Sequence, residues 1–387
     1  MRQTVKKKTD IINAQLALDQ FIRHGASSYA RARNFDLGQG KHSAVSNLSK
    51  YVSHRLLFEF DIIERILAEH SYQQTEKFIQ EVFWRVYWKG WLENRPQVWS
   101  AFKSQSCVEM TTELKHAQIG STGIACFDSW VEELRDTNYL HNHARMWFAS
   151  IWIFTLKLPW HLGARFFMAH LYDGDAASNT LSWRWVAGLQ TKGKHYVARS
   201  SNIAKYTNHR FPHTQLNENP IPLTEDIEFS LEGNLPLTPN SRKFNQLAVF
   251  ETDLHLQAGN KSYADYEVVY VVSLDKCHRH AELSESVADF KASLLRNFSE
   301  NLSNTRYMTS EEFSTLASSF DGLDVVYPFV GDCLDFINEL SATKQIPTNF
   351  LLRAQDLTCW RHAKKGFFNF KKQIKSLISQ TTSAKFR

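Results

Sequence analysis

The fold of this chain is decided by two stretches, LHNHARMWFASIWIF at residues 140–154 and WHLGARFFMAHLYDGDAASNTLSWRW at residues 160–185. In the first, Asn142, Arg145, Met146 and Ala149 recur at i, i+3, i+4 and i+7, so their side chains share one face of a helix expected over 141–158. Asn offers both a donor and an acceptor, Arg a planar cation and Met a soft apolar contact. Such a face suits a ligand, but taken by itself the pattern is weak evidence.

The second stretch places two carboxylates around a glycine just before a helix that runs to Ala187. Asp173 and Asp175 fit simple capping of that helix. They fit equally well as acceptors for a ring N–H and a ribose hydroxyl. Trp183 and Trp185 stand two residues apart and therefore serve opposite sides of the helix, and core packing is the ordinary explanation for such a pair.

A third group lies upstream in EVFWRVYWKGW at residues 81–91, within a helix expected over 76–92. Glu81, Trp84, Arg85 and Trp88 share one helix face. A charged pair beside two indoles fits a site for a planar, phosphate-bearing ligand. It fits equally a partly buried salt bridge covered by Trp, and both interpretations stay open.

Composition sets broad limits. The chain has 387 residues, a net charge of +5, 27 Phe, 13 Tyr and 11 Trp, which suits a core around a flat ring or simply a large helical core. Five scattered cysteines without CxxC spacing, and the divergence of His141 and His143 on a helix, argue against a metal site. The most apolar run, 146–160, is too short for a bilayer. We expect a cytoplasmic protein with no membrane partner.

The pattern changes along the chain. Residues 1–210 show helical periodicity, and residues 211–243 hold five of the nine prolines and predict a linker or an extended arm. Residues 244–387 alternate short β-branched runs, such as EVVYVVSL at 267–274 and LDVVYPFV at 323–330, with helical segments. We therefore predict a mainly α protein, with an all-helical domain followed by a small α/β domain with parallel strands.

Four further blocks stand in order with the two opening stretches: YARARNF at 29–35, SNLSKYV at 46–52, FIQEVFWRVYW at 78–88 and TGIACFDSWVEEL at 122–134. Together they resemble the FAD-binding catalytic domain of the DNA photolyase/cryptochrome family over about residues 15–210. The resemblance implies an all-helical bowl that holds FAD. It implies contacts to FAD from Tyr29, Val45, Ser46, Asn47, Leu48, Ser49, Arg85, Arg145, Asp173, Gly174, Asp175 and Asn179.

Several of these positions carry a specific implied role. Ser46 and Ser49 would bond the diphosphate, Arg145 would pair with Asp173 against the flavin ring, and Asn179 would face flavin N5. Two positions depart from the family pattern, because Val45 stands where Thr is usual and Asn47 where Arg is usual. Both departures weaken the phosphate loop.

The same resemblance implies a DNA substrate. The pocket for a flipped-out cyclobutane pyrimidine dimer would comprise Glu81, Trp84, Asn142, Met146 and Trp185, and Arg33 would contact the DNA backbone. Trp183 and Trp160 would be the inner and middle members of an electron-transfer chain whose outer Trp is not evident. The implied reaction is light-driven electron transfer from reduced FAD to the dimer, followed by ring splitting and electron return.

Two other functions remain open. The missing outer Trp, the altered phosphate loop and the unusual C-terminal region favour a cryptochrome-like blue-light sensor with a protein signalling partner. A structural helical protein that binds nothing is the third hypothesis. The basic segment 188–211 fits contact with DNA phosphates and fits a solvated face as well.

The resemblance also bears on architecture. The family's N-terminal antenna domain is absent from this sequence, whereas residues 246–275 look like the opening of such a domain and residues 351–370 faintly like its end. The C-terminal region is therefore either a shortened, relocated antenna-like domain or an unrelated α/β domain. Its antenna chromophore, if one binds, is unknown.

Overall fold

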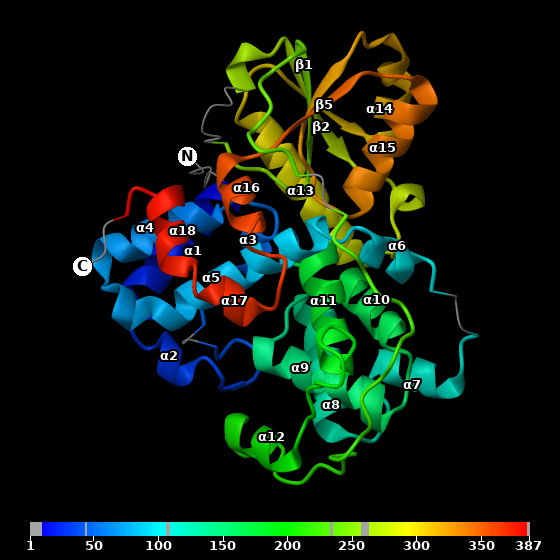
Figure 1. The fold of residues 1–387 in the computed structure, drawn as a ribbon. Helices are drawn as coiled ribbons and strands as arrows, with labels where there is room; N and C mark the ends of the chain where they lie inside the picture. The colour runs from blue at the N-terminus through cyan, green and yellow to red at the C-terminus, as the bar shows by residue number, and fades with distance from the viewer. Residues whose placement is uncertain (1–9, 43–44, 106–108, 233–234, 257–262, 385–387) are drawn as a thin grey trace, which may run out of the picture.

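The computed structural model describes residues 10–42, 45–105, 109–232, 235–256 and 263–384. Figure 1 shows a large helical part, built from the first half of the chain, below a smaller part that contains the sheet. Among the described residues, every strand lies after residue 245. No described helix is both long enough and apolar enough to cross a membrane.

Residues 10–210 contain twelve α-helices within their described part, several of them short. They are α1 Asp10–His24, α2 Tyr29–Ala32, α3 Ser49–Val52, α4 Glu59–Glu69, α5 Tyr72–Glu93, α6 Gln97–Lys103, α7 Thr112–Ile119, α8 Ala125–Thr137, α9 Asn142–Ser150, α10 Trp160–His170, α11 Ala176–Ala187 and α12 Ser200–Tyr206. The long amphipathic helices were predicted, whereas α6, α7 and α12 were not.

The helix predicted over 141–158 is wrong at its C-terminal end. Helix α9 passes at Ser150 into a π-helical segment, η1 Ile151–Thr155, and Lys157 has a left-handed φ of 57°. Pro159 follows Lys157 by two residues. Its ring disfavours the helical conformation at the preceding residue, Leu158. The turn between 155 and 160 lets α10 start in a new direction.

Helix α5 is the central element of the helical part. A capping box between Ser71 and Gln74 fixes its start, because each side chain bonds the other residue's backbone N–H. Helices α4 and α11 pack against it. It buries residues all round, including Phe78, Phe83 and Tyr87, as expected for a helix inside a core.

The sheet has five strands in the order β3-β2-β1-β4-β5, and all pairs are parallel. The strands are β1 Gln246–Phe250, β2 Val268–Ser273, β3 Thr305–Thr309, β4 Leu323–Val326 and β5 Thr348–Leu351. Helices α13 Glu285–Glu300, α14 Ser310–Leu316 and α15 Asp332–Lys344 connect them. The predicted parallel pairing is confirmed, but the edge strands β3 and β5 were missed because their sequences, TRYMT and TNFL, lack a buried β-branched run.

After β5 the chain returns to the helical part. Helices α16 Ala354–Trp360, α17 Phe367–Lys371 and α18 Ile374–Thr381 lie beside α4 and α5, as the red end of the chain in Figure 1 shows. Trp360, Phe367 and Phe370 are buried there. The division of the chain at residues 210 and 243 remains a prediction, and these three helices show that residues 354–381 belong spatially to the helical part.

Gly90 of α5 marks how closely this return segment packs. A Cβ atom at position 90 would lie 2.4 Å from Cδ1 of the Trp360 indole. Gly90→Ala is therefore expected to lower the free energy of unfolding by about 1–3 kcal/mol through overpacking. The measurement is urea unfolding followed by tryptophan fluorescence.

Gly366→Ala is the matched control, since a Cβ there meets no atom within 4 Å and its φ of −60° suits any residue. We expect that variant to change stability by less than about 1 kcal/mol. Equal losses in the two variants would mean that the α5–α16 contact is looser than described.

Candidate functional site

Two arginine–aspartate pairs meet at the start of α11. Asp175 is the N-cap of this helix, and its Oδ1 accepts a hydrogen bond from Ser178 N at 2.9 Å. Its Oδ2 lies 2.8 Å from Nη2 of Arg85 on α5. Asp173 pairs with Arg145 on α9, with 3.0 Å between Nη2 and Oδ2. The resemblance implied the second pair, and the structure contains it.

Both aspartates are held in their ionised form. Burial alone would raise the pKa of Asp173, but Arg145 and a hydrogen bond from Ser49 outweigh it and lower that pKa. The pKa of Asp175 is lowered for the same reason, since burial is outweighed by Arg85, Lys89 and the α11 cap. The site therefore presents two carboxylates and two guanidinium groups in a buried setting.

Some polar atoms at this site have hydrogen-bonding capacity left over. The Nε atom of Arg85 is buried and has no hydrogen-bond partner among the described residues, although Oε1 of Glu59 lies 3.8 Å away. The contact of Arg85 Nη2 with Asp175 Oδ2 is close but lacks hydrogen-bond geometry. Buried donors of this kind normally find a partner, so the start of α11 has the chemistry of a ligand site.

The loop before α3 contributes hydroxyl groups. Ser46 Oγ accepts from Leu48 N at 3.4 Å, and Ser49 reaches Asp173. Asn47 has a left-handed φ of 52°, a conformation that Asn tolerates better than most residues. Val45 is half-buried in this loop, and residues 43–44 lie outside the described part.

The remaining predicted flavin contacts lie close by. Asn179 is buried on α11, and its amide donates to the Ala164 carbonyl at 2.8 Å. Gly174 N donates to Leu171 O within the turn that leads into the helix. Tyr29 begins α2, and its ring packs edge-on against Phe78 of α5. Their assignment as cofactor contacts remains a prediction.

Arg33 and Glu81, predicted to contact DNA and the dimer respectively, pair with each other. Arg33 Nη1 lies 2.5 Å from Glu81 Oε1, and both side chains are partly exposed. Burial raises the pKa of Glu81, and Arg33 opposes that rise. Each residue is therefore already engaged in the free protein, and a DNA partner would have to open this pair.

The other predicted pocket residues lie on the neighbouring helices α5, α9 and α11. Asn142 is exposed at the first turn of α9, and Met146 is half-buried one turn later. Trp185 stacks on Tyr196 with 5.7 Å between ring centroids. Trp84 packs against Phe367 of α17, with 3.8 Å between the ring centroids. One face of this indole is therefore covered by the return segment.

The two predicted electron-transfer tryptophans have different surroundings. Trp183 is buried, 5.1 Å from Phe167 and 6.2 Å from Trp152 between ring centroids. Trp160 stacks on Phe102 at 5.6 Å, and Phe102 in turn contacts Trp99. Sequence reasoning did not anticipate Trp152, Trp99 or Phe102 as neighbours, and nothing in their spacing indicates it.

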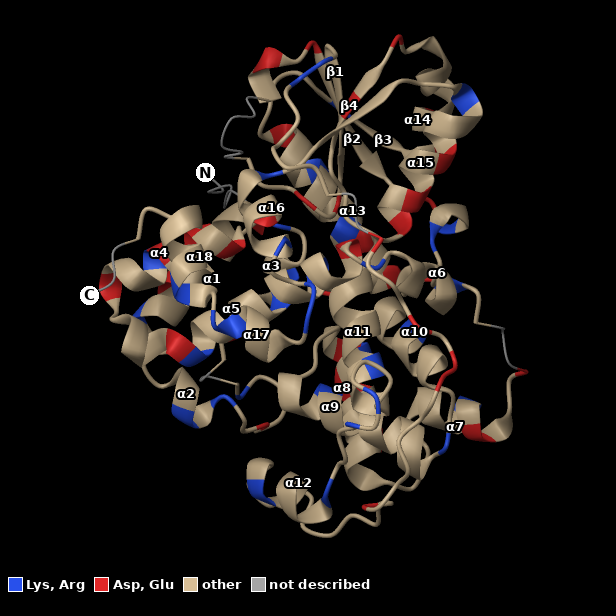
Figure 2. Cartoon of the chain, viewed as in Figure 1, with Lys and Arg blue, Asp and Glu red and all other residues tan. Residues whose placement is uncertain are grey.

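The basic segment 188–211 is only partly free. Lys192 pairs with Glu228 and Arg210 with Asp36. Figure 2 shows further Lys and Arg positions on α12 and the chain beside it.

Glu59 and Lys89 extend the site beyond the predicted residues. Glu59 is fully buried near Arg85, and Lys89 lies one turn beyond Arg85 on α5. Helical spacing places Lys89 on the same face of α5 as Arg85, whereas Arg55 precedes α4 with a left-handed φ of 52°, so its spacing from Glu59 gave no helical signal. Neither charge stood out until the fold showed it buried.

The chain is similar to known proteins in this region. Residues 78–222 match the family model of the FAD binding domain of DNA photolyase. Deoxyribodipyrimidine photo-lyases of Vibrio cholerae and Escherichia coli are 28% and 29% identical over 200 and 192 residues, covering 48% and 46% of this chain and 41% and 39% of theirs. A solved bacterial class III photolyase from Agrobacterium tumefaciens is 25% identical with a TM-score of 0.44, covering 51% of this chain and 42% of that one. The aligned region is therefore about two-fifths of the length of these curated relatives.

Proposed function

Because residues 78–222 place this chain in the DNA photolyase/cryptochrome family, we propose that it is an FAD-dependent, blue-light-driven flavoprotein of photolyase type that splits cyclobutane pyrimidine dimers in DNA. The observation that carries the proposal is the meeting of Arg85–Asp175 and Arg145–Asp173 at the start of α11, inside the matched region.

FAD is the cofactor, and the residues at this site fit it. Guanidinium and hydroxyl donors suit a diphosphate, and Arg85, Ser46 and Ser49 supply them. Asp173 and Asp175 are ionised acceptors for N–H and O–H groups of a flavin or ribose. Arg145 projects from α9 and pairs with Asp173, and a guanidinium group can stack on a ring.

Bound reduced FAD supplies the electron after excitation by blue light. The residues of the chain bind the cofactor, exclude water and present the substrate. Trp183 is buried among Trp152, Phe148 and Phe167, and Trp160 is partly exposed. We propose that these two indoles carry electrons inward from the surface.

Dimer recognition rests on Glu81, Trp84, Asn142, Met146 and Trp185. A damaged, poorly stacked base pair costs less to extrude from a duplex. The two indoles supply faces for its apolar rings, Met146 adds a soft contact, and Glu81 and Asn142 bond its polar edges.

A second candidate is a cryptochrome-like photoreceptor that signals to a protein partner without repair. The observation that favours it is the contact of Phe367 with Trp84, since this covers an indole face that the dimer would need. The return segment that carries Phe367 would then be the element that responds to light.

One experiment separates the two functions. Purified, reduced, FAD-containing protein is illuminated with an oligonucleotide that contains a pyrimidine dimer, in parallel with Phe367→Ala. Repair by the wild-type protein is the expected result. Repair by Phe367→Ala alone would mean that α17 blocks the pocket, and no dimer loss in either sample would rule out the photolyase proposal. A light-dependent change in protease cleavage around 211–245, without repair, would favour the photoreceptor.

A further inference from the structure

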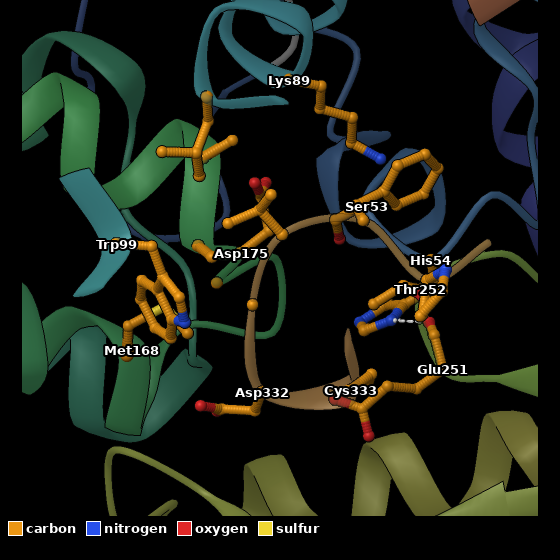
Figure 3. Close-up of a pocket in the computed structure, with 18 of the residues that line it drawn as sticks. Ser53, His54, Lys89, Trp99, Met168, Asp175, Glu251, Thr252, Asp332 and Cys333 are labelled. Atoms are coloured by element: carbon orange, nitrogen blue, oxygen red, sulfur yellow. Dashed lines mark hydrogen bonds between the residues drawn. The ribbon is translucent and has the colours of Figure 1, made fainter. Parts of the chain in front are cut away.

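A cavity of about 60 Å³ lies between the sheet and the helical part, at the end of α5 and the start of α11. Its wall includes Lys89, Glu251, Thr252, residues 174–177 and residues 328–333. Figure 3 shows Lys89 and Asp175 directing their polar ends into this space from two different helices. Of the residues predicted to contact FAD, only Gly174 and Asp175 belong to the wall, so the cavity adjoins the candidate flavin site and shares these two residues with it.

The cavity lies at the carboxyl ends of β1 and β4, where the chain reverses the direction in which it adds strands to the sheet. The chain moves from β1 outward through β2 to β3, then crosses to β4 on the other side of β1 and continues to β5. Glu251 and Thr252 directly follow β1, and residues 328–333 follow β4. Parallel sheets bind ligands in the crevice outside the carboxyl ends of such a strand pair.

Two helices direct their N-terminal ends to the same place. Helix α11 has 12 residues and α15 has 13, and the first residues of both line the cavity. The N-cap of α15 is Gly331, which offers no side-chain oxygen to the first N–H groups. Helix N-termini carry a partial positive charge that favours an anion; at α11 the Asp175 carboxylate already accepts from Ser178 N, and the first turn of α15 contains Asp332 and Asp335.

Lys89 supplies an independent indication. Its side chain is only 4% exposed, and within the described part of the chain its ammonium group makes no hydrogen bond or ion pair. It lies 4.0 Å from the ring centroid of Phe329. Burial, assisted by Arg55 and Arg85, lowers the pKa of Lys89 to about 8, while Glu59 and Asp175 oppose that shift, so the group remains mainly charged at neutral pH. A buried charge without a directly contacting counter-ion is costly.

No carboxylate of the described wall lies within 4.0 Å of the Lys89 ammonium group, although Asp175 acts on it from further away, and each acidic group has a closer partner. Glu251 pairs with Arg279 and Lys291, Asp175 with Arg85, Glu93 accepts from Tyr327 Oη and Val330 N, and Asp332 accepts from His280 N. Burial also raises the pKa of Glu93 to about 7, so this carboxyl is partly neutral at neutral pH, whereas Asp332, with its pKa raised to about 6, remains mostly ionised. Arg279 and Lys291 are ion-paired with Glu251, so among the described wall cations Lys89 is the one without a carboxylate within 4.0 Å.

Thr252 adds an unused donor. Its Oγ1 atom is buried and has no hydrogen-bond partner among the described residues. A hydroxyl and an ammonium group are both hydrogen-bond donors, and an oxyanion has several acceptor oxygens for them. The volume of about 60 Å³ suits a small ion and excludes a nucleotide or an aromatic ring.

We propose that this cavity binds one small tetrahedral oxyanion of the phosphate class, held by Lys89, by Thr252 and by the N-terminal ends of α11 and α15. The ion would join the sheet to the helical part, because its ligands come from both. The site does not depend on the proposed reaction, since neither light nor DNA enters the argument.

The test is equilibrium dialysis of the FAD-saturated protein against labelled inorganic phosphate at fixed ionic strength. We expect saturable binding of one ion per chain, competition by sulfate, and no competition by phenyl phosphate, which is too large. Lys89→Met should weaken binding by about tenfold to a hundredfold, the usual value of a hydrogen bond to a charged group. Lys192→Met removes an exposed lysine and should leave the affinity unchanged.

Several results would overturn the proposal: no saturable phosphate binding by the wild-type protein, equal affinity in folded Lys89→Met, or equal competition by phenyl phosphate. If Lys89→Met does not fold, Thr252→Val takes its place, with an expected loss of about twofold to tenfold. Unchanged affinity in that variant would exclude the site. Loss of dimer repair with intact phosphate binding would count against the photolyase proposal alone.

Discussion

Replacement of Arg55 by methionine is expected to lower the free energy of unfolding by about 3–5 kcal/mol. Arg55 is fully buried, and its guanidinium group contacts three carboxylates. Nη2 lies 2.6 Å from Asp356 Oδ1, Nε 3.1 Å from Glu59 Oε2, and Nη1 3.3 Å from Asp253 Oδ2. Removal of the cation leaves buried carboxylates without their main counter-charge. Chemical denaturation of both proteins measures the difference.

Arg65→Met is the matched control, because Arg65 also pairs with an aspartate, Asp19, but both side chains are more than one-third exposed. An exposed pair contributes about 0–1 kcal/mol. A loss of similar size in the two variants would contradict the assigned role of the Arg55 cluster.

The same cluster predicts acid sensitivity. Burial is outweighed by Arg353 and Arg55, which lower the pKa of Asp253 below its ordinary value. Below the ordinary aspartate pKa of about 3.9 the unfolded chain takes up a proton that folded Asp253 does not, so stability falls as pH falls. The pH dependence below about pH 4 should be shallower in Arg55→Met than in the wild-type protein.

The large effect expected of Arg55→Met on the free energy of unfolding reflects the positions of the residues in this cluster. Arg55 and Glu59 belong to the helical part, Asp253 follows β1, and Asp356 lies on α16. Arg353 also holds Asp253, at 2.6 Å. One cluster therefore connects the helical part, the sheet and the return segment. Arg55 is 198 residues from Asp253 and 301 residues from Asp356 in the sequence.

Local sequence patterns predicted the elements whose stability is local. Helices α5 and α11 have helical spacing or capping residues, and β2 and β4 have β-branched runs, so each was recognised. The edge strand β3 is only half-buried, and its sequence therefore carries no strong period. The return of α16–α18 to α5 was not predictable, because it depends on the fit of Trp360 against Gly90.

The candidate site shows the same limit. Helical spacing put Glu81 and Arg85 on one face, and the resemblance paired Arg145 with Asp173, as found. No local pattern indicated that Phe367 would cover one face of Trp84, or that Arg33 would form an ion pair with Glu81. Contacts between segments far apart in sequence require the fold, and here they decide how open the proposed dimer pocket is.

Asp173→Asn is expected to weaken FAD binding by about a hundredfold, or about 2.7 kcal/mol. Asp173 is buried and holds Arg145 through two contacts, 3.1 Å from Nη1 to Oδ1 and 3.0 Å from Nη2 to Oδ2. The neutral amide has the same shape but lacks the charge and the second acceptor oxygen, so Arg145 loses its orientation. The lowered pKa of Asp173 indicates that the ionised form is the one that the protein stabilises.

The measurement is the visible absorbance of the purified protein, followed by titration of the apoprotein with FAD. Asp19→Asn is the control, since it removes an aspartate that also pairs with an arginine but lies at the surface. That variant should keep the wild-type flavin content. Full FAD occupancy in folded Asp173→Asn would show that the start of α11 does not hold the cofactor. The family membership would then stand, and the flavin contacts would have to be sought elsewhere among α3, α5 and α9.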